Sequence, residues 1–110
     1  MSVSDEYLTY VVEQLECLGE VQSRRMFGGA GIYCDGLFFA VVADDVLYFK
    51  VDDSNLADYE AAGMEPFRPF PDKQAVMQYY EVPIDVLENR QTLHDWAQKA
   101  LDVAKRKADR

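Results

Sequence analysis

Residues 37–43 have the sequence Leu-Phe-Phe-Ala-Val-Val-Ala, an unbroken apolar run. Successive side chains of a strand point to opposite faces of a sheet, so a strand here would present apolar groups on both faces. Such a strand belongs in the middle of a sheet, with helices or a partner covering each side. We therefore expect a central strand over 37–43. We also expect a homodimer to cover any face that the chain's own helices leave open.

Turn signals on both sides of this run predict an antiparallel meander. Asp35-Gly36 precedes the run, and Asp-Gly favours a two-residue hairpin because both central residues need positive φ. Asp44-Asp45 follows it as a weaker turn signal. Alternating apolar and polar residues then predict strands at about 21–27, 30–34, 37–43 and 46–51, with a fifth near 75–80.

Helical periodicity appears at both ends of the chain. Ser4 can cap a helix whose apolar positions run from Leu8 to Leu15, and a longer amphipathic helix begins at about Arg90. Shorter helices are expected after Ser54 and after Pro83, and the proline-rich stretch 64–74 is expected to be an ordered loop. The sequence predicts one α+β domain over 1–110, an antiparallel sheet of about five strands flanked by N-terminal and C-terminal helices.

Composition and charge narrow the class of protein. The chain is 49% hydrophobic and 28% charged, close to the globular average. It has no apolar stretch long enough to span a membrane and no signal-peptide pattern, so we expect a cytoplasmic protein with Cys17 and Cys34 as free thiols. Residues 98–110 carry a net charge of +3. The whole chain carries −9, so the residues before 98 sum to −12. An acidic body predicts no membrane binding and only weak, salt-sensitive contact with nucleic acid through the basic end.

The segment 24–31, Arg-Arg-Met-Phe-Gly-Gly-Ala-Gly, is the most unusual local sequence. One interpretation is an anion site, in which glycine N–H groups and an arginine bind a phosphate. The other is a tight or bulged connection between strands, where glycine alone tolerates the backbone angles. Adjacent arginines of a strand point to opposite faces, so one at most would face a given ligand. The candidate residues of this segment are Arg24, Arg25, Gly28, Gly29 and Gly31.

A second candidate surface comes from the strand at 46–51, where Tyr48 and Lys50 share a face. Tyrosine is favoured at protein interfaces, so this face is a plausible docking patch.

No catalytic or metal-binding set is predicted. His94 is the one histidine, and its helical neighbours supply neither a metal ligand nor a nucleophile. The paired acidic residues fall at turns and helix starts, where carboxylates accept hydrogen bonds from backbone N–H groups. We expect no cofactor and no metal.

Several separate motifs resemble the N-terminal domain of the TfoX/Sxy competence regulators. The resemblance runs from about residue 7 to 104. Its named members are bacterial regulators that promote competence gene expression, and they have no established catalytic residues to transfer. The larger regulators carry a second, C-terminal domain, so a chain ending at Arg110 is expected to be a stand-alone domain. The resemblance is carried by Arg25-Met26-Phe27-Gly28-Gly29, Gly31, Tyr33, Phe39-Ala40, Leu47-Tyr48-Phe49-Lys50-Val51, Ala62-Gly63-Met64, Pro66-Phe67, Tyr79-Tyr80-Glu81-Val82-Pro83 and Trp96-Ala97.

The resemblance and the residues together predict a non-catalytic regulatory module that binds a protein partner, such as a component of the transcription machinery. The alternative is a small-anion or phosphate-binding domain, or an enzyme, that uses the segment of Arg24 and Arg25.

Overall fold

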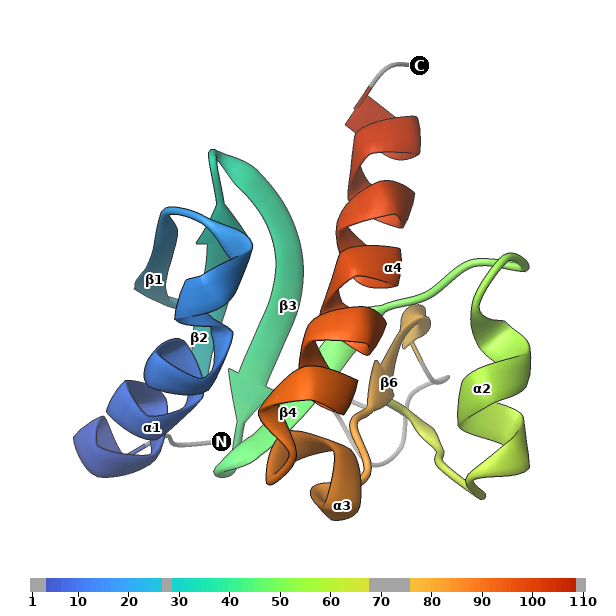
Figure 1. Ribbon diagram of the computed structural model, residues 1–110, viewed down its shortest axis with the longest axis horizontal. Helices are drawn as coiled ribbons and strands as arrows, with labels where there is room; N and C mark the ends of the chain where they lie inside the picture. The colour runs from blue at the N-terminus through green and yellow to red at the C-terminus, as the bar shows by residue number, and fades with distance from the viewer. Residues whose placement is uncertain (1–3, 27–28, 68–75, 109–110) are drawn as a thin grey trace.

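The computed structural model describes residues 4–26, 29–67 and 76–108, which form a sheet with helices packed on one of its faces (Figure 1). The strands are β1 (Val21–Met26), β2 (Gly29–Cys34), β3 (Leu37–Ala43), β4 (Val46–Lys50), β5 (Pro66–Phe67) and β6 (Val76–Glu81). The helices are α1 (Asp5–Leu15), the 3₁₀ turn η1 (Glu16–Leu18), α2 (Leu56–Ala61), α3 (Ile84–Leu87) and α4 (Arg90–Ala108).

The sheet has the strand order β1-β2-β3-β4-β6-β5, and every pair is antiparallel. The predicted α+β class and meander are therefore confirmed, and β3 lies inside the sheet as its apolar run predicts. The short edge strand β5 was not predicted, because its residues fall in the stretch expected to be a loop. It is two residues long and begins with Pro66, a residue that sheets tolerate at an edge because it has no N–H to donate.

Both hairpins around β3 use turn residues with positive φ. Asp35 and Gly36 have φ values of 50° and 83°, and Asp44 and Asp45 have 52° and 56°. Aspartate tolerates this left-handed region better than most residues, so the weaker turn signal builds the same kind of turn. Asp45 also accepts hydrogen bonds from the Ser4 N–H at 2.8 Å and the Ser4 hydroxyl at 3.2 Å. The turn thereby holds the residue that caps α1.

A one-residue register shift between β2 and β3 allows two consecutive residues of β3, Phe39 and Ala40, to be buried in the core. Ile32 lies opposite Ala40 and Tyr33 opposite Phe38, so Phe39 has no partner in β2. This bulge places the Phe39 ring 5.8 Å from the Phe49 ring in the core, while Phe38 lies on the other face beside Tyr33. Phe39, Ala40 and Phe49 are fully buried.

The core lies between the sheet and the helices, with α4 packed against β3 and β4. One buried polar group joins the helices on this side. The Gln14 amide donates to the Leu87 carbonyl at 2.9 Å and accepts from Arg90 Nε at 2.8 Å, so its polar atoms are satisfied. Gln14 thus connects α1 to α3 and to the start of α4.

Candidate functional site

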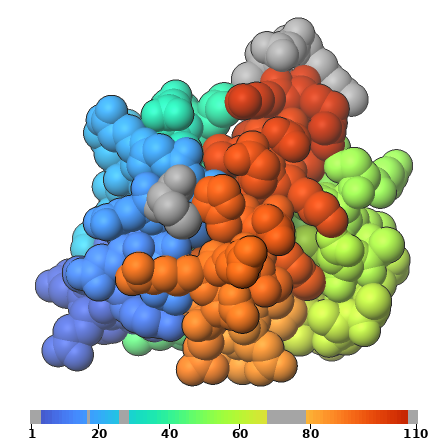
Figure 2. All heavy atoms as spheres, in the orientation of Figure 1, coloured from blue at the N-terminus to red at the C-terminus, as the bar shows by residue number. Residues whose placement is uncertain are grey.

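Among the described residues, the sheet has a second face that carries no helix. In Figure 1 the helices all lie in front of the sheet, and in Figure 2 they form a continuous surface that hides most of it from that side. Directly opposed residues of neighbouring strands share a face, so the register assigns side chains to the far side. We call this side the helix-free face and define it by Arg24, Tyr33, Phe38, Tyr48, Lys50, Phe67 and Tyr79.

Two cations and three aromatic rings form a row across this face. The Arg24 guanidinium lies 5.9 Å from the centroid of the Tyr33 ring, which stacks on Phe38 with centroids 5.0 Å apart. The Lys50 ammonium lies 5.9 Å from the Phe38 centroid and 5.7 Å from that of Tyr79. These are cation–π distances, so the rings hold both cations. The residues of this row come from five strands, β1, β2, β3, β4 and β6.

A second aromatic pair lies next to the row. Tyr48 of β4 and Phe67 of β5 have ring centroids 4.7 Å apart. Both side chains are half-buried, as are Tyr33, Phe38 and Lys50. A face of half-buried aromatic rings has the composition that protein interfaces favour.

Burial shifts the pKa values of three groups on this face. Burial raises the pKa of Tyr79, which is 8% exposed, to about 12, with a smaller contribution from Tyr33. It also raises the pKa of Tyr48, with Glu81 and Asp44 adding to the effect. The pKa of Lys50 is lowered, first by burial of its ammonium and then by the nearby charge of Lys107. Lys50 is thus a cation in surroundings that disfavour its charge.

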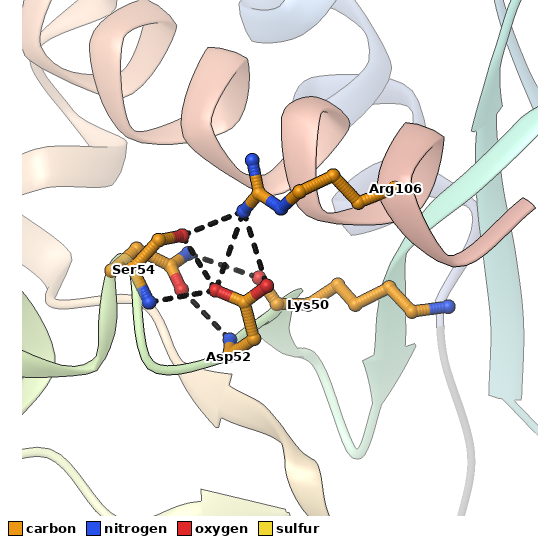
Figure 3. Close-up of polar contacts among 5 residues, drawn as sticks. Lys50, Asp52, Ser54 and Arg106 are labelled. Atoms are coloured by element: carbon orange, nitrogen blue, oxygen red, sulfur yellow. Dashed lines mark hydrogen bonds and ion pairs between the residues drawn. The ribbon is translucent and has the colours of Figure 1, made fainter. Parts of the chain in front are cut away.

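Several cations elsewhere in the described residues are paired with carboxylates, although Arg90 donates to the Gln14 amide instead. Arg25 pairs with Asp5, Lys99 with Asp58 at 2.7 Å, and Arg106 with Asp52 at 3.1 Å. Within the described residues Arg24 and Lys50 make ring contacts but no ion pair. Figure 3 shows the Lys50 side chain pointing away from the Asp52–Arg106 pair, although its backbone adjoins that cluster.

The Asp52 cluster ties the end of α4 to the corner between β4 and α2. Asp52 accepts from the Ser54 N–H at 2.8 Å and from the Ser54 hydroxyl at 2.5 Å, and Arg106 also donates to that hydroxyl at 2.7 Å (Figure 3). Burial alone would raise the pKa of Asp52, but the hydrogen bonds from Ser54 and Arg106 outweigh it and lower the pKa. Part of the basic C-terminal end therefore has a structural role.

The structure separates the residues of the arginine–glycine segment. Arg24 lies on the helix-free face, whereas Arg25 reaches Asp5 of α1 on the opposite side. The two arginines therefore form no common clamp, and Gly28 lies outside the described residues.

Gly29 and Gly31 lie within strand β2, and the described glycines with positive φ are Gly19, Gly36 and Gly63. The expected reason for glycine, unusual backbone angles, is therefore wrong at these two positions. At Gly29 the reason is close packing, because a Cβ there would lie 2.6 Å from the Val42 carbonyl oxygen.

The predicted docking patch is extended by residues that the sequence analysis did not select. Tyr48 and Lys50 do share the helix-free face, and Tyr33, Phe38, Phe67 and Tyr79 join them. Tyr80, the neighbour of Tyr79, packs in the core on the other face, although both residues are almost fully buried. The period of two along β6 could have assigned this pair to opposite faces once one of them was placed.

The described residues lack the ligand set of a metal site. They contain no group of three His, Cys, Asp or Glu side chains placed to hold a metal ion. Cys34 is a buried free thiol near the Leu18 carbonyl, and burial raises its pKa. Nor does any described helix have the length and apolar character needed to cross a bilayer.

A known protein family matches most of the chain. The model of the TfoX N-terminal domain matches residues 13–104, which include all of the helix-free face. No curated protein sequence matches the chain. Since the match spans most of the 110 residues, the chain belongs to the TfoX N-terminal domain family.

Proposed function

We propose that this chain is a non-catalytic, regulatory module that binds a partner protein through its helix-free face. The observation that carries the proposal is the pairing of the cations. The chain has 20 Asp and Glu residues, yet within its described part Arg24 and Lys50 rest on aromatic rings and form no ion pair. A half-buried ammonium without a counter-ion is an unfavourable arrangement that a partner's carboxylate would relieve.

The partner's expected chemistry follows from these contacts. It presents carboxylates to Arg24 and Lys50, and apolar groups to the rings between them. The overall charge of −9 does not prevent this, because charges further away than about 8 Å are largely screened at physiological salt. Tyrosine and arginine are also the side chains that most often dominate the energy of protein interfaces.

Nucleic acid is a less suitable partner for the same face. Tyr33 and Phe38 stack on each other, and Lys50 lies against Phe38 and Tyr79, so the ring faces are already occupied. Binding of single strands depends on ring faces that are free for bases to stack on. The alternative of an anion site formed by Arg24 and Arg25 together is not favoured, because the two side chains lie on opposite faces.

The experiment is quantitative capture of partners from the source cell, with variants on each face. Tyr48→Ala and Lys50→Ala should remove a captured protein that the wild type retains, since both residues lie on the helix-free face. Lys99→Ala is the matched control, a lysine on the helix side, and should retain it. Equal retention by all variants, or a chain that sediments as a dimer until Tyr48 is replaced, would refute the partner-protein assignment.

A further inference from the structure

Two large apolar side chains are exposed on the helix side, and both line the same hollow. Ile84 is 68% exposed and Tyr10 is 38% exposed, and these are the exposed large hydrophobic residues of the described part of the chain. The hollow lies where the start of α1, the β3–β4 turn and α3 meet, and its volume is about 580 Å³. Exposed apolar groups that gather in one hollow with a polar rim are typical of interaction sites.

The fold does not explain the exposure of Ile84. It is the first residue of α3, after Pro83, and the helix is anchored by Val86 and Leu87, which are both buried. A polar residue would serve equally at this position, because the side chain contributes little to the core. Ile84 thus has apolar surface available for a contact outside the chain.

The rim of the hollow is acidic. Glu6, Asp45 and Glu88 line it, and no described lysine or arginine does. Asp45 is held in place by its two hydrogen bonds from Ser4. Burial raises the pKa of Tyr7, which also lines the hollow, to about 12, and the charge of Asp45 contributes to that rise. The contribution of Asp45 to the raised pKa of Tyr7 is consistent with a negative potential in the hollow.

We infer that this hollow docks a basic, amphipathic segment of a partner protein. A lysine or arginine can lay its aliphatic stem on Ile84 and Tyr10 while its charged end reaches Glu6 or Glu88. The net charge of −9 has the same sign as the charge of the rim, so local and overall charge agree. This surface lies on the helix side and is independent of the helix-free face.

A second copy of this chain is a poorer occupant. Two cations of the basic C-terminal helix, Lys99 and Arg106, already pair with Asp58 and Asp52. In Figure 1 the C-terminal end of α4 and the helix α3 lie at opposite ends of the molecule, so insertion of one copy's tail into another's hollow would join copies head to tail. Head-to-tail contacts tend to propagate into open chains, which a strongly charged protein resists.

The test uses a labelled amphipathic peptide of lysine and leucine, titrated at about 0.15 M salt and followed by fluorescence anisotropy. Ile84→Ser should weaken binding about tenfold, and Glu88→Gln about threefold. Glu60→Gln, which removes an exposed charge of α2, is the matched control and should bind like the wild type. Lys50→Ala should also bind normally, which separates this site from the helix-free face. Ile84 is exposed, so its replacement should leave thermal unfolding unchanged.

Three outcomes would overturn the inference. An equal loss with Glu60→Gln would mean general attraction to an acidic protein. Unchanged binding by Ile84→Ser would mean that the apolar hollow takes no part. A wild-type chain that sediments as an assembly, and becomes monomeric with Ile84→Ser, would mean that a second copy occupies the hollow.

Discussion

The two faces of the sheet use similar residues in different ways. On the helix side the aromatic rings of Phe39 and Phe49 are fully buried, and the cations Lys99 and Arg106 are neutralised by carboxylates. On the helix-free face the rings of Phe38 and Tyr33 are half-buried and hold cations directly. In the first arrangement the rings are removed from water and these two cations have partners within the chain. The second leaves rings partly in water and two cations that form no ion pair among the described residues, so the two faces differ in burial and in charge pairing.

The largest expected difference between the two faces is in the free energy of unfolding when Phe38 or Phe39, neighbours on opposite faces, is replaced. Phe39→Ala should lower the free energy of unfolding by about 3–5 kcal/mol, because it leaves a cavity in the core. Phe38→Ala should cost about half as much or less, because its ring is already half in water. Urea unfolding of the two variants measures both. Equal costs would mean that the helix-free face is as much a part of the core as the other.

The next effect concerns the glycine that lets β2 approach β3. Gly29→Ala should lower the free energy of unfolding by about 1–3 kcal/mol, because the new Cβ would lie 2.6 Å from the Val42 carbonyl oxygen. Thermal unfolding measures it, with Ser23→Ala on the exposed part of β1 as the control. A Gly29→Ala chain as stable as the wild type would show that the strands can separate to admit a methyl group.

A smaller effect tests the ion pairing of the helix side. A double-mutant cycle on Asp52→Asn and Arg106→Ala should give a coupling of about 0.5–1 kcal/mol at neutral pH, since both side chains are partly exposed. The folded-state pKa of Asp52 lies below its ordinary value of 3.8, so the stabilisation exists above that pH. It is lost as the pH falls through the lowered pKa.

Urea unfolding of the four chains at neutral and at acid pH measures this coupling. A coupling that persists after the carboxyl is protonated would mean that packing, not charge, joins α4 to the β4–α2 corner.

The smallest expected effect is that of replacing Arg25, and it distinguishes the role of Arg25 from that of Arg24. Its pair with Asp5 is exposed, so Arg25→Ala should change the free energy of unfolding by no more than about 0.5 kcal/mol. It should also leave partner capture intact, because the side chain does not lie on the helix-free face. Loss of capture with this variant, and not with Arg24→Ala, would move the contact surface to the α1 side of the sheet.

The sequence predicted the parts of the molecule that depend on local pattern. The apolar run 37–43 gave a central strand, and the period of two put Arg24 and Arg25 on opposite faces. The row from Arg24 to Tyr79 was not predictable in this way. It depends on the alignment of five strands and on the bulge at Phe39, both of which are set by tertiary packing.

The same limit applies to the edge strand and to the hollow. β5 is too short to have a pattern of its own, and it pairs with β6 across the stretch predicted as a loop. The hollow brings together residues near positions 6, 45 and 84 that are far apart along the chain. Ile84 could be predicted to lie on a short helix, but not to be exposed there.

The most direct measurement is tyrosine-selective chemical labelling of the free chain and of the chain bound to the protein whose capture depends on Tyr48 and Lys50. Tyr33 and Tyr48 report on the helix-free face, and Tyr10 reports on the helix side. The account predicts that the partner protects Tyr33 and Tyr48 and leaves Tyr10 as reactive as in the free chain. Protection of Tyr10 alone, with Tyr33 and Tyr48 unchanged, would contradict it.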